Sequence, residues 1–105
     1  MTGVDAPDEA VRHFQLGQLV TSRAGRDSGR PYLVVGIRPD GKVLVADGRH
    51  RPVARAKAKN PRHLWRHDRV APSVSEQLRL GKPVSDGDLA RALDELLGDQ
   101  ERPAG

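Results

Sequence analysis

Positive charge is concentrated in one stretch of the chain, residues 49–69. This stretch holds eight Arg or Lys residues and a single acid, Asp68, so its net charge is +7 with histidines counted as neutral. The ends of the chain are acidic, because residues 1–11 hold three acids and no base, and residues 85–101 hold six acids against Arg91. A basic block between acidic ends is typical of a surface that binds a polyanion. Nucleic acid is therefore the first partner to consider.

A glycine-bounded turn at residues 23–30 gathers further cations. Gly25 and Gly29 allow the backbone to bend tightly and to approach a ligand closely. Between and beside them, the turn projects three guanidinium groups, those of Arg23, Arg26 and Arg30. Arginine binds phosphate oxygens through paired hydrogen bonds, so such a turn at the edge of a rigid sheet suits phosphate binding. The alternative interpretation is a solvated hairpin in which Asp27 pairs with an arginine of the turn.

Other chemistries have few candidate groups in this chain. The sequence has no cysteine, which excludes disulfides, thiolate metal sites and cysteine nucleophiles. Its serines are explained by turns, strands and helix caps, and no nucleophile elbow, P-loop or dinucleotide-binding glycine pattern is present. His63 and His67 are spaced as i and i+4, but no Glu or Cys completes a metal site. We expect a protein that is not an enzyme and that uses no cofactor, metal or small-molecule substrate.

Aromatic residues are scarce, with one Phe, one Tyr and one Trp. This number is too small for the stacking platforms that bind single-stranded bases. We expect Trp65 to pack in the core or against a helix, with stacking on a base as the alternative. Tyr32 starts an expected strand, where its hydroxyl group could lie close to the basic turn. A surface rich in arginine and poor in aromatics suits the backbone and shape of folded RNA.

The elements that position these residues are short. The chain has 105 residues, 36% of them hydrophobic, and a net charge of +4, which indicates one small domain. Apolar runs predict four or five strands, at residues 14–22, 32–37, 42–46, 63–66 and, more weakly, 52–54. The pairs Asp40-Gly41 and Asp47-Gly48 mark tight connections between antiparallel neighbours. The result is a small twisted sheet or barrel, with residues 33–35 and 43–45 covered on both faces.

Two helices are expected after Pro72. Ser73 and Glu76 match a capping box, and Gly81 ends the first helix. Ser85 and Asp88 begin the second helix, which we expect Gly98 to end. Its leucines form one apolar face that must be buried against the sheet or against a partner, at positions 89, 93, 96 and 97. We expect residues 1–12 to be a flexible arm and residues 99–105 a flexible tail.

The chain contains no apolar run long enough to span a membrane, and its acidic N-terminus does not have the order of a secretory signal. We therefore expect a cytoplasmic protein with no membrane partner.

Residues 17–37 resemble the KOW motif. In this motif a strand precedes a glycine-bounded charged turn, and a strand rich in β-branched residues follows it. The matching positions are Gly17, Val20, Ser22, Gly25-Arg26-Asp27-Ser28-Gly29-Arg30 and Tyr32-Leu33-Val34-Val35-Gly36-Ile37. One departure is Ser28, where many KOW turns carry lysine, so this turn has one cation fewer.

The likeness continues through residues 43–48, 51–53 and 57–64 and covers roughly residues 14–97. These segments are similar to small bacterial KOW-domain RNA-binding proteins related to large-subunit ribosomal proteins of archaea and eukaryotes. The resemblance implies a five-stranded SH3-like barrel over residues 13–70 and a two-helix extension over residues 71–98. It also implies binding to RNA, above all to ribosomal RNA of the large ribosomal subunit.

Charge and resemblance together predict an RNA-binding surface. Its backbone is set by Gly25 and Gly29, and its cations are Arg23, Arg26, Arg30, Arg49, Arg51, Lys57, Lys59, Arg62 and Arg66. Within this set, Lys57 and Lys59 have a second explanation, since charged residues on an edge strand discourage pairing between molecules. KOW domains also bind proteins. The alternative function is therefore an interaction adapter in transcription or translation that uses the barrel edge or the leucine face of the last helix.

Overall fold

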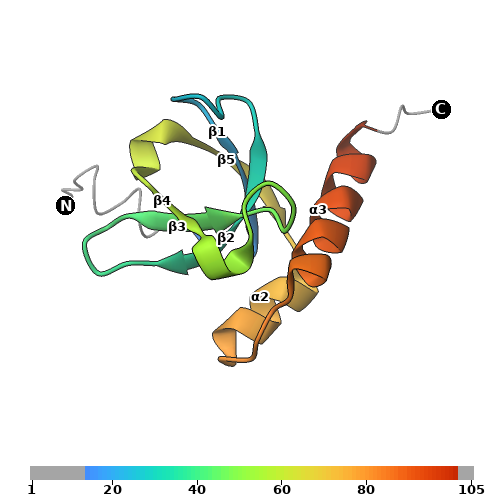
Figure 1. Ribbon diagram of the computed structural model, residues 1–105. Coiled ribbons are helices and arrows are strands. Elements are labelled where there is room, and N and C mark those ends of the chain that lie inside the picture. The colour runs from blue at the N-terminus through green and yellow to red at the C-terminus, as the bar shows by residue number, and fades with distance from the viewer. Residues whose placement is uncertain (1–13, 102–105) are drawn as a thin grey trace, which may run out of the picture.

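The computed structural model describes residues 14–101, which form a five-stranded antiparallel sheet and two α-helices (Figure 1). The strands are β1 (Gln18–Ser22), β2 (Pro31–Ile37), β3 (Val43–Ala46), β4 (Lys57–Lys59) and β5 (Leu64–Val70). The helices are α2 (Pro72–Arg79) and α3 (Asp86–Glu101), and two short 3₁₀ turns are η1 (Val53–Arg55) and η2 (Pro61–His63). The expected arm at residues 1–12 and the last four residues of the expected tail lie outside the described residues.

The sheet is curved but open. Its strand order is β4-β3-β2-β1-β5, so β4 and β5 are edges, and no ladder between them is present in the described residues. Strand pairing alone therefore does not close the sheet into a barrel. Two register shifts bend the sheet, one in the β1–β5 ladder between Gln18 and Val20 and one in the β2–β3 ladder between Val34 and Gly36, because a bulge increases the local twist. Figure 1 shows the strands wrapping around a common interior.

Alternate residues of the central strands enter two separate hydrophobic clusters. The inner cluster, on the concave side of the sheet, is Phe14, Val20, Tyr32, Val34, Val43, Val45 and Leu64. The outer cluster lies between the opposite face and the helices, and includes Leu19, Leu33, Ala46, Val74, Leu89 and Leu93. Val20 and Leu33 are both fully buried although they belong to different faces. The prediction that the central strands are covered on both faces is confirmed.

The predicted strand at residues 52–54 is wrong. Val53–Arg55 form the 3₁₀ turn η1, and the strand lies five residues later, at β4. Pro52 has no N–H group to donate to a ladder. The N–H group of Val53 donates to Asp86 Oδ1 at 2.7 Å, which joins this segment to α3 instead of to a strand.

The start of α2 and the end of α3 differ from the positions that the sequence signals predicted. The predicted capping box at Ser73 is wrong, because Pro72 occupies the first helical position and Ala71 is the N-cap; proline suits that position since it has no N–H group to leave unpaired. At α3 the predicted box forms, with Ser85 and Asp88 exchanging hydrogen bonds at 3.0 and 3.2 Å. Gly98 does not end α3, which continues to Glu101.

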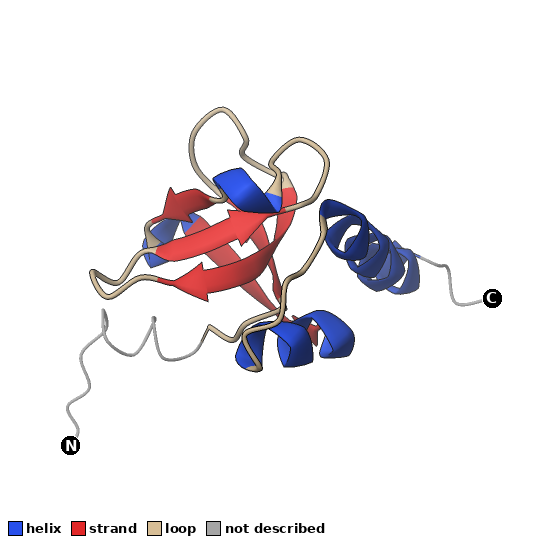
Figure 2. Cartoon of the chain, turned by 60° about the horizontal axis from the view of Figure 1, so that its bottom comes forward, coloured by secondary structure: helices blue, strands red, loops and turns tan. Residues whose placement is uncertain are grey.

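Helix α3 is fastened to the sheet by the segment after β3. Gly48 has a φ of +81°, and a Cβ atom there would lie 2.2 Å from the Asp86 carbonyl oxygen, so only glycine fits this contact. Arg49 adds a two-pronged ion pair to Asp94, with distances of 3.0 and 2.9 Å. Both helices lie on the side of the sheet away from the β2–β3 hairpin (Figure 2). In Figure 1 the charged turn between β1 and β2 lies at the opposite end of the molecule from α2.

Candidate functional site

The turn between β1 and β2 has a fixed backbone. Gly29 donates to the Ser22 carbonyl at 2.7 Å, and Ser22 donates to the Arg30 carbonyl at 3.0 Å. Gly25 and Gly29 have φ angles of +84° and +89°, a region that other residues enter at a cost. Both glycines therefore lie at the bends of the turn. Arg23 and Arg26 are exposed on this frame, and Arg30 is half-buried.

Asp27 is the anchor of the turn. Its carboxylate accepts hydrogen bonds from Ser22 Oγ at 2.9 Å, from Tyr32 Oη at 2.7 Å and from Lys59 Nζ at 2.9 Å. The interpretation in which Asp27 pairs with an arginine of the turn is therefore wrong. Lys59 of β4 neutralises this carboxylate from inside the domain. The arginines of the turn therefore do not need to pair with it.

The surroundings of Asp27 favour its ionised form. Burial raises the pKa of this carboxyl group, but the hydrogen bonds from Lys59, Tyr32 and Ser22 and the charge of Lys59 outweigh burial. The net result is a pKa well below the ordinary value for aspartate. Burial and the bond to the Asp27 carboxylate also raise the pKa of Tyr32 above its ordinary value. The cluster is thus an ion pair with a neutral tyrosine across the physiological pH range.

Lys59 is not placed to contact a ligand. It is only 8% exposed, and its ammonium group lies against Asp27 and Ser22 Oγ, the latter at 3.1 Å. The expectation that this lysine binds RNA is corrected: it bridges edge strand β4 to the β1–β2 turn across the open side of the sheet. Its neighbour Lys57 has a 40% exposed side chain, 3.6 Å from Asp27 Oδ2, and remains accessible.

Arg49 and Arg51 also serve the fold. Arg49 is held by Asp94 of α3, and the Arg51 guanidinium lies over the Arg55 carbonyl oxygen at 3.4 Å. The backbone N–H groups of both residues donate to Asp47 Oδ1, at 2.9 and 2.8 Å. Arg49 and Arg51 thus have partners within the fold, and we build the candidate site from the other predicted cations, without Lys59.

The remaining cations lie around the turn and the adjoining start of β5. Arg23 donates its backbone N–H to the His63 carbonyl at 2.9 Å, which joins the turn to η2. Asn60 Oδ1 accepts the N–H of Arg62 at 3.0 Å and fixes the start of η2. We call this surface the basic end, and its members are Arg23, Arg26, Arg30, Lys57, Arg62 and Arg66. The bond between Arg23 and His63 thus links the three arginines of the turn to Arg62 and Arg66 of the basic segment.

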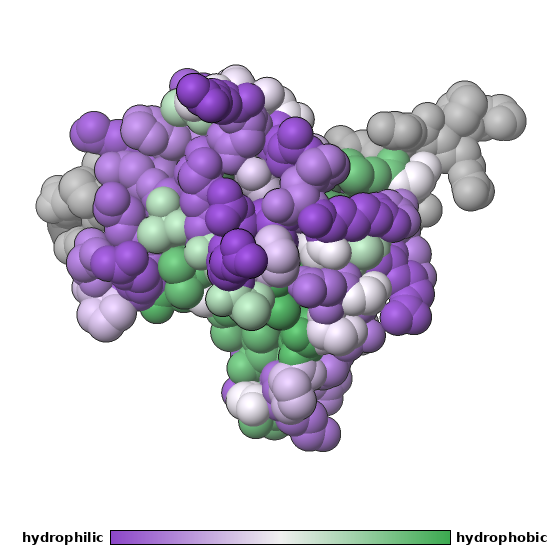
Figure 3. Space-filling view, viewed as in Figure 1, coloured by the Kyte–Doolittle hydropathy of each residue, from purple (hydrophilic) through white to green (hydrophobic). Residues whose placement is uncertain are grey.

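Trp65 is on the surface, which corrects the expectation of a core position. The residue is 56% exposed, and the Arg23 guanidinium carbon lies 4.5 Å from the centre of its ring system. Trp65 lies on edge strand β5, opposite Thr21 of β1. Alternation along the strand puts Arg66 on the opposite face from Trp65, so the basic end wraps around this edge of the sheet. Hydrophilic residues dominate this region in Figure 3, and apolar surface gathers between the sheet and α2.

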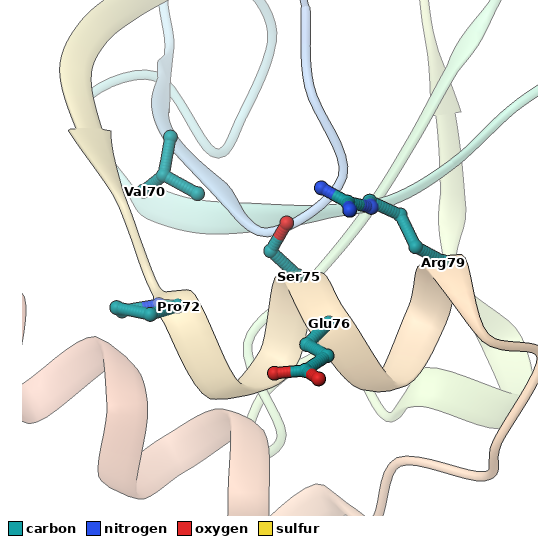
Figure 4. Close-up of a pocket in the computed structure, with 5 residues that line it drawn as sticks. All are labelled: Val70, Pro72, Ser75, Glu76 and Arg79. Carbon is teal, nitrogen blue, oxygen red and sulfur yellow. The ribbon is translucent and has the colours of Figure 1, made fainter.

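A shallow hollow lies at the other end of β5, where the strand meets α2 (Figure 4). Its volume is about 440 Å³, and it is lined by Val70, Pro72, Ser75, Glu76 and Arg79. Ser75 and Arg79 turn to one side of α2, and Glu76 turns away from them. Arg79 is therefore an exposed cation at a distance from the turn, suitable as a control position.

Further observations bear on metals, membranes and relatives. Within residues 14–101, no group of three or more His, Cys, Asp or Glu side chains is arranged to hold a metal ion. His67 Nε2 instead lies 2.7 Å from Thr21 Oγ1. Neither helix of the described residues has the length and apolar character needed to cross a membrane. Compared with known proteins, the chain matches no protein-family model and no curated protein.

Proposed function

We propose that this protein binds structured RNA through the basic end, as a KOW-type domain that docks on ribosomal RNA of the large subunit. The observation that carries the proposal is the separation of roles among the cations. The only acid of the turn is satisfied from inside by Lys59, so the turn presents its arginines outward on a rigid backbone.

Within residues 14–101, the accessible arginines of the basic end have no carboxylate partner. Among the described residues, no carboxylate lies within 4.0 Å of the guanidinium groups of the basic end, namely Arg23, Arg26, Arg30, Arg62 and Arg66, whereas the arginines at 38, 49 and 91 each pair with an aspartate. An unpaired guanidinium keeps its donors available for two oxygens of one phosphate. Phosphate contacts of this kind position a protein on folded RNA without reading its sequence.

We further propose that the domain is SH3-like. The hairpin β1–β2 carries the motif residues of the KOW resemblance, and the positive φ angles of Gly25 and Gly29 fall at its turn. The side-chain bridge from Lys59 to Asp27 spans the side of the sheet where a barrel would close. These features support a barrel-like domain whose closure depends on side chains.

The alternative adapter function has less support from the geometry. Leu89 and Leu93 are no more than 4% exposed and belong to the outer hydrophobic cluster, and Leu96 and Leu97 pack against it. The leucine face of α3 therefore covers the protein's own sheet. To bind in a groove of a partner, this face would have to separate from the sheet. The ion pair between Arg49 and Asp94 would then break as well.

Sedimentation of cell lysate through a sucrose gradient tests the ribosomal part of the proposal. We expect the protein to co-migrate with large subunits at about 0.1 M salt and to move to the light fractions at about 0.5 M salt, because phosphate contacts release counterions. The small-subunit fraction of the same gradient is the internal control. Migration in the light fractions at both salt concentrations would argue against ribosome docking and favour the adapter.

A further inference from the structure

Trp65 is the single tryptophan of the chain and contributes to neither hydrophobic cluster. The aromatic members of the inner cluster are Tyr32 and Phe14. A small domain with three aromatic residues gains stability by burying the largest of them. An indole that is 56% exposed on an edge strand therefore indicates a role outside the core.

The indole is held in place by its neighbours. The Arg23 guanidinium lies 4.5 Å from the ring centre, a distance typical of cation–π stacking. The backbone of Arg23 is held by its N–H bond to the His63 carbonyl, and the backbone of Trp65 lies in the ladder opposite Thr21. An aromatic ring and a planar guanidinium that are already stacked form a surface onto which a further flat group can add at a small entropic cost.

The charge around the indole identifies the flat group. Arg62 is exposed on the same segment, three residues before Trp65, so their backbone positions are at most roughly 11 Å apart. A planar ligand that also carries negative charge fits an indole with Arg23 and Arg62 beside it. In RNA, an unpaired base provides the plane and its flanking phosphates provide the charge.

We propose that Trp65 and Arg23 form a stacking site for one unpaired base, so that the basic end prefers structured RNA with a bulge or a loop over an uninterrupted duplex. This inference rests on the proposed RNA binding and narrows its ligand. Base stacking on an aromatic ring is sequence-tolerant, so the preference is for an accessible base and not for its identity.

Two RNA hairpins of equal length and charge test the site, one fully paired and one with a single bulged adenine. Because the chain has a single tryptophan, its fluorescence reports on this site alone. We expect the wild type to bind the bulged hairpin roughly 5- to 150-fold more tightly than the paired one, with quenching of Trp65 fluorescence by the bulged hairpin. Trp65→Ala should abolish the preference and leave affinity for the paired hairpin unchanged, while Trp65→Phe should retain part of it.

Leu80→Ala is the matched control, because Leu80 is an equally exposed apolar residue, 60% accessible, at the end of α2. It should keep the full preference for the bulged hairpin. Equal affinity of the wild type for both hairpins, or an equal loss for both in Trp65→Ala, would overturn the stacking site and leave RNA binding intact. Failure of the wild type to bind either hairpin would instead refute the proposed function.

Discussion

Asp27→Ala is expected to lower the free energy of unfolding by about 3–5 kcal/mol, the usual cost of removing one partner from a buried ion pair. The reason is that the Lys59 ammonium, in a side chain only 9% exposed, would lose its counter-charge while staying away from water. Folded domains have a total stability of about 5–15 kcal/mol, so the loss is a large part of it. Urea unfolding followed by circular dichroism measures the change.

Arg38→Ala provides the control for an exposed pair. Arg38 and Asp40 are as close, at 2.7 Å, but both side chains are about half exposed, and exposed pairs contribute at most about 1 kcal/mol. The double variant Asp27→Ala/Lys59→Met should recover stability relative to Asp27→Ala, since it removes the unpaired charge. A loss below about 1 kcal/mol in Asp27→Ala would mean that the pair does not hold the turn.

The same pair makes stability depend on pH with a defined sign. Because the pKa of Asp27 is lowered in the folded state, the unfolded chain binds more protons at acidic pH. The stability that Asp27 contributes is therefore fully present above its unfolded pKa of about 3.9 and is lost as pH falls further. The difference in unfolding free energy between wild type and Asp27→Asn should accordingly shrink as pH is lowered from about 5 to about 2.

Charge reversal of the turn should produce the largest change in RNA binding. Arg26→Glu/Arg30→Glu removes two phosphate contacts, and each contact contributes about 0.7 to 0.9 to the slope of log affinity against log salt. One decade of salt separates 1 M, taken as the reference, from about 0.1 M. Over that decade the double variant should therefore lose roughly 25- to 60-fold or more in affinity relative to the wild type. Fluorescence anisotropy with a labelled structured RNA, repeated over a range of salt concentrations, measures both affinity and slope.

Arg79→Glu/Lys82→Glu changes the charge by the same amount at the α2 end of the molecule, where both residues are exposed. This control should lose no more than a few-fold in affinity. Both double variants should keep the circular dichroism spectrum of the wild type, since all four side chains are at least partly exposed. Equal losses in the two variants would mean that net charge, and not the turn, determines binding.

Local signals in the sequence predicted most of the sheet. The apolar runs and the glycines at the turns located β1, β2 and β3, because tight antiparallel hairpins depend on neighbours in the chain. The leucine spacing located α3 for a similar reason. The signal for its end failed at Gly98, because a glycine ends a helix only where it adopts a positive φ, and Gly98 is not among the glycines that do so.

Long-range contacts decided what the sequence did not reveal. Asp27 bonds with Lys59, which is 32 residues away, whereas a reading of nearby residues offered only the arginines of the turn. The same contact took Lys59 out of the predicted binding set, and α3 took Arg49 out through Asp94. The one signal in the sequence for a buried partner was that Asp27 is the only acid in a turn rich in arginine. Trp65 was assigned to the core from its size, yet β5 is an edge strand whose outer positions are open.

If the basic end is the RNA-binding surface, backbone NMR during titration with a structured RNA should place the contact there. At about 0.1 M salt, we expect the amide signals of residues 23–30 and 62–66 to shift or broaden, while those of α2 and α3 stay in place. Changes confined to α3, or an unchanged spectrum at excess RNA, would contradict the claim.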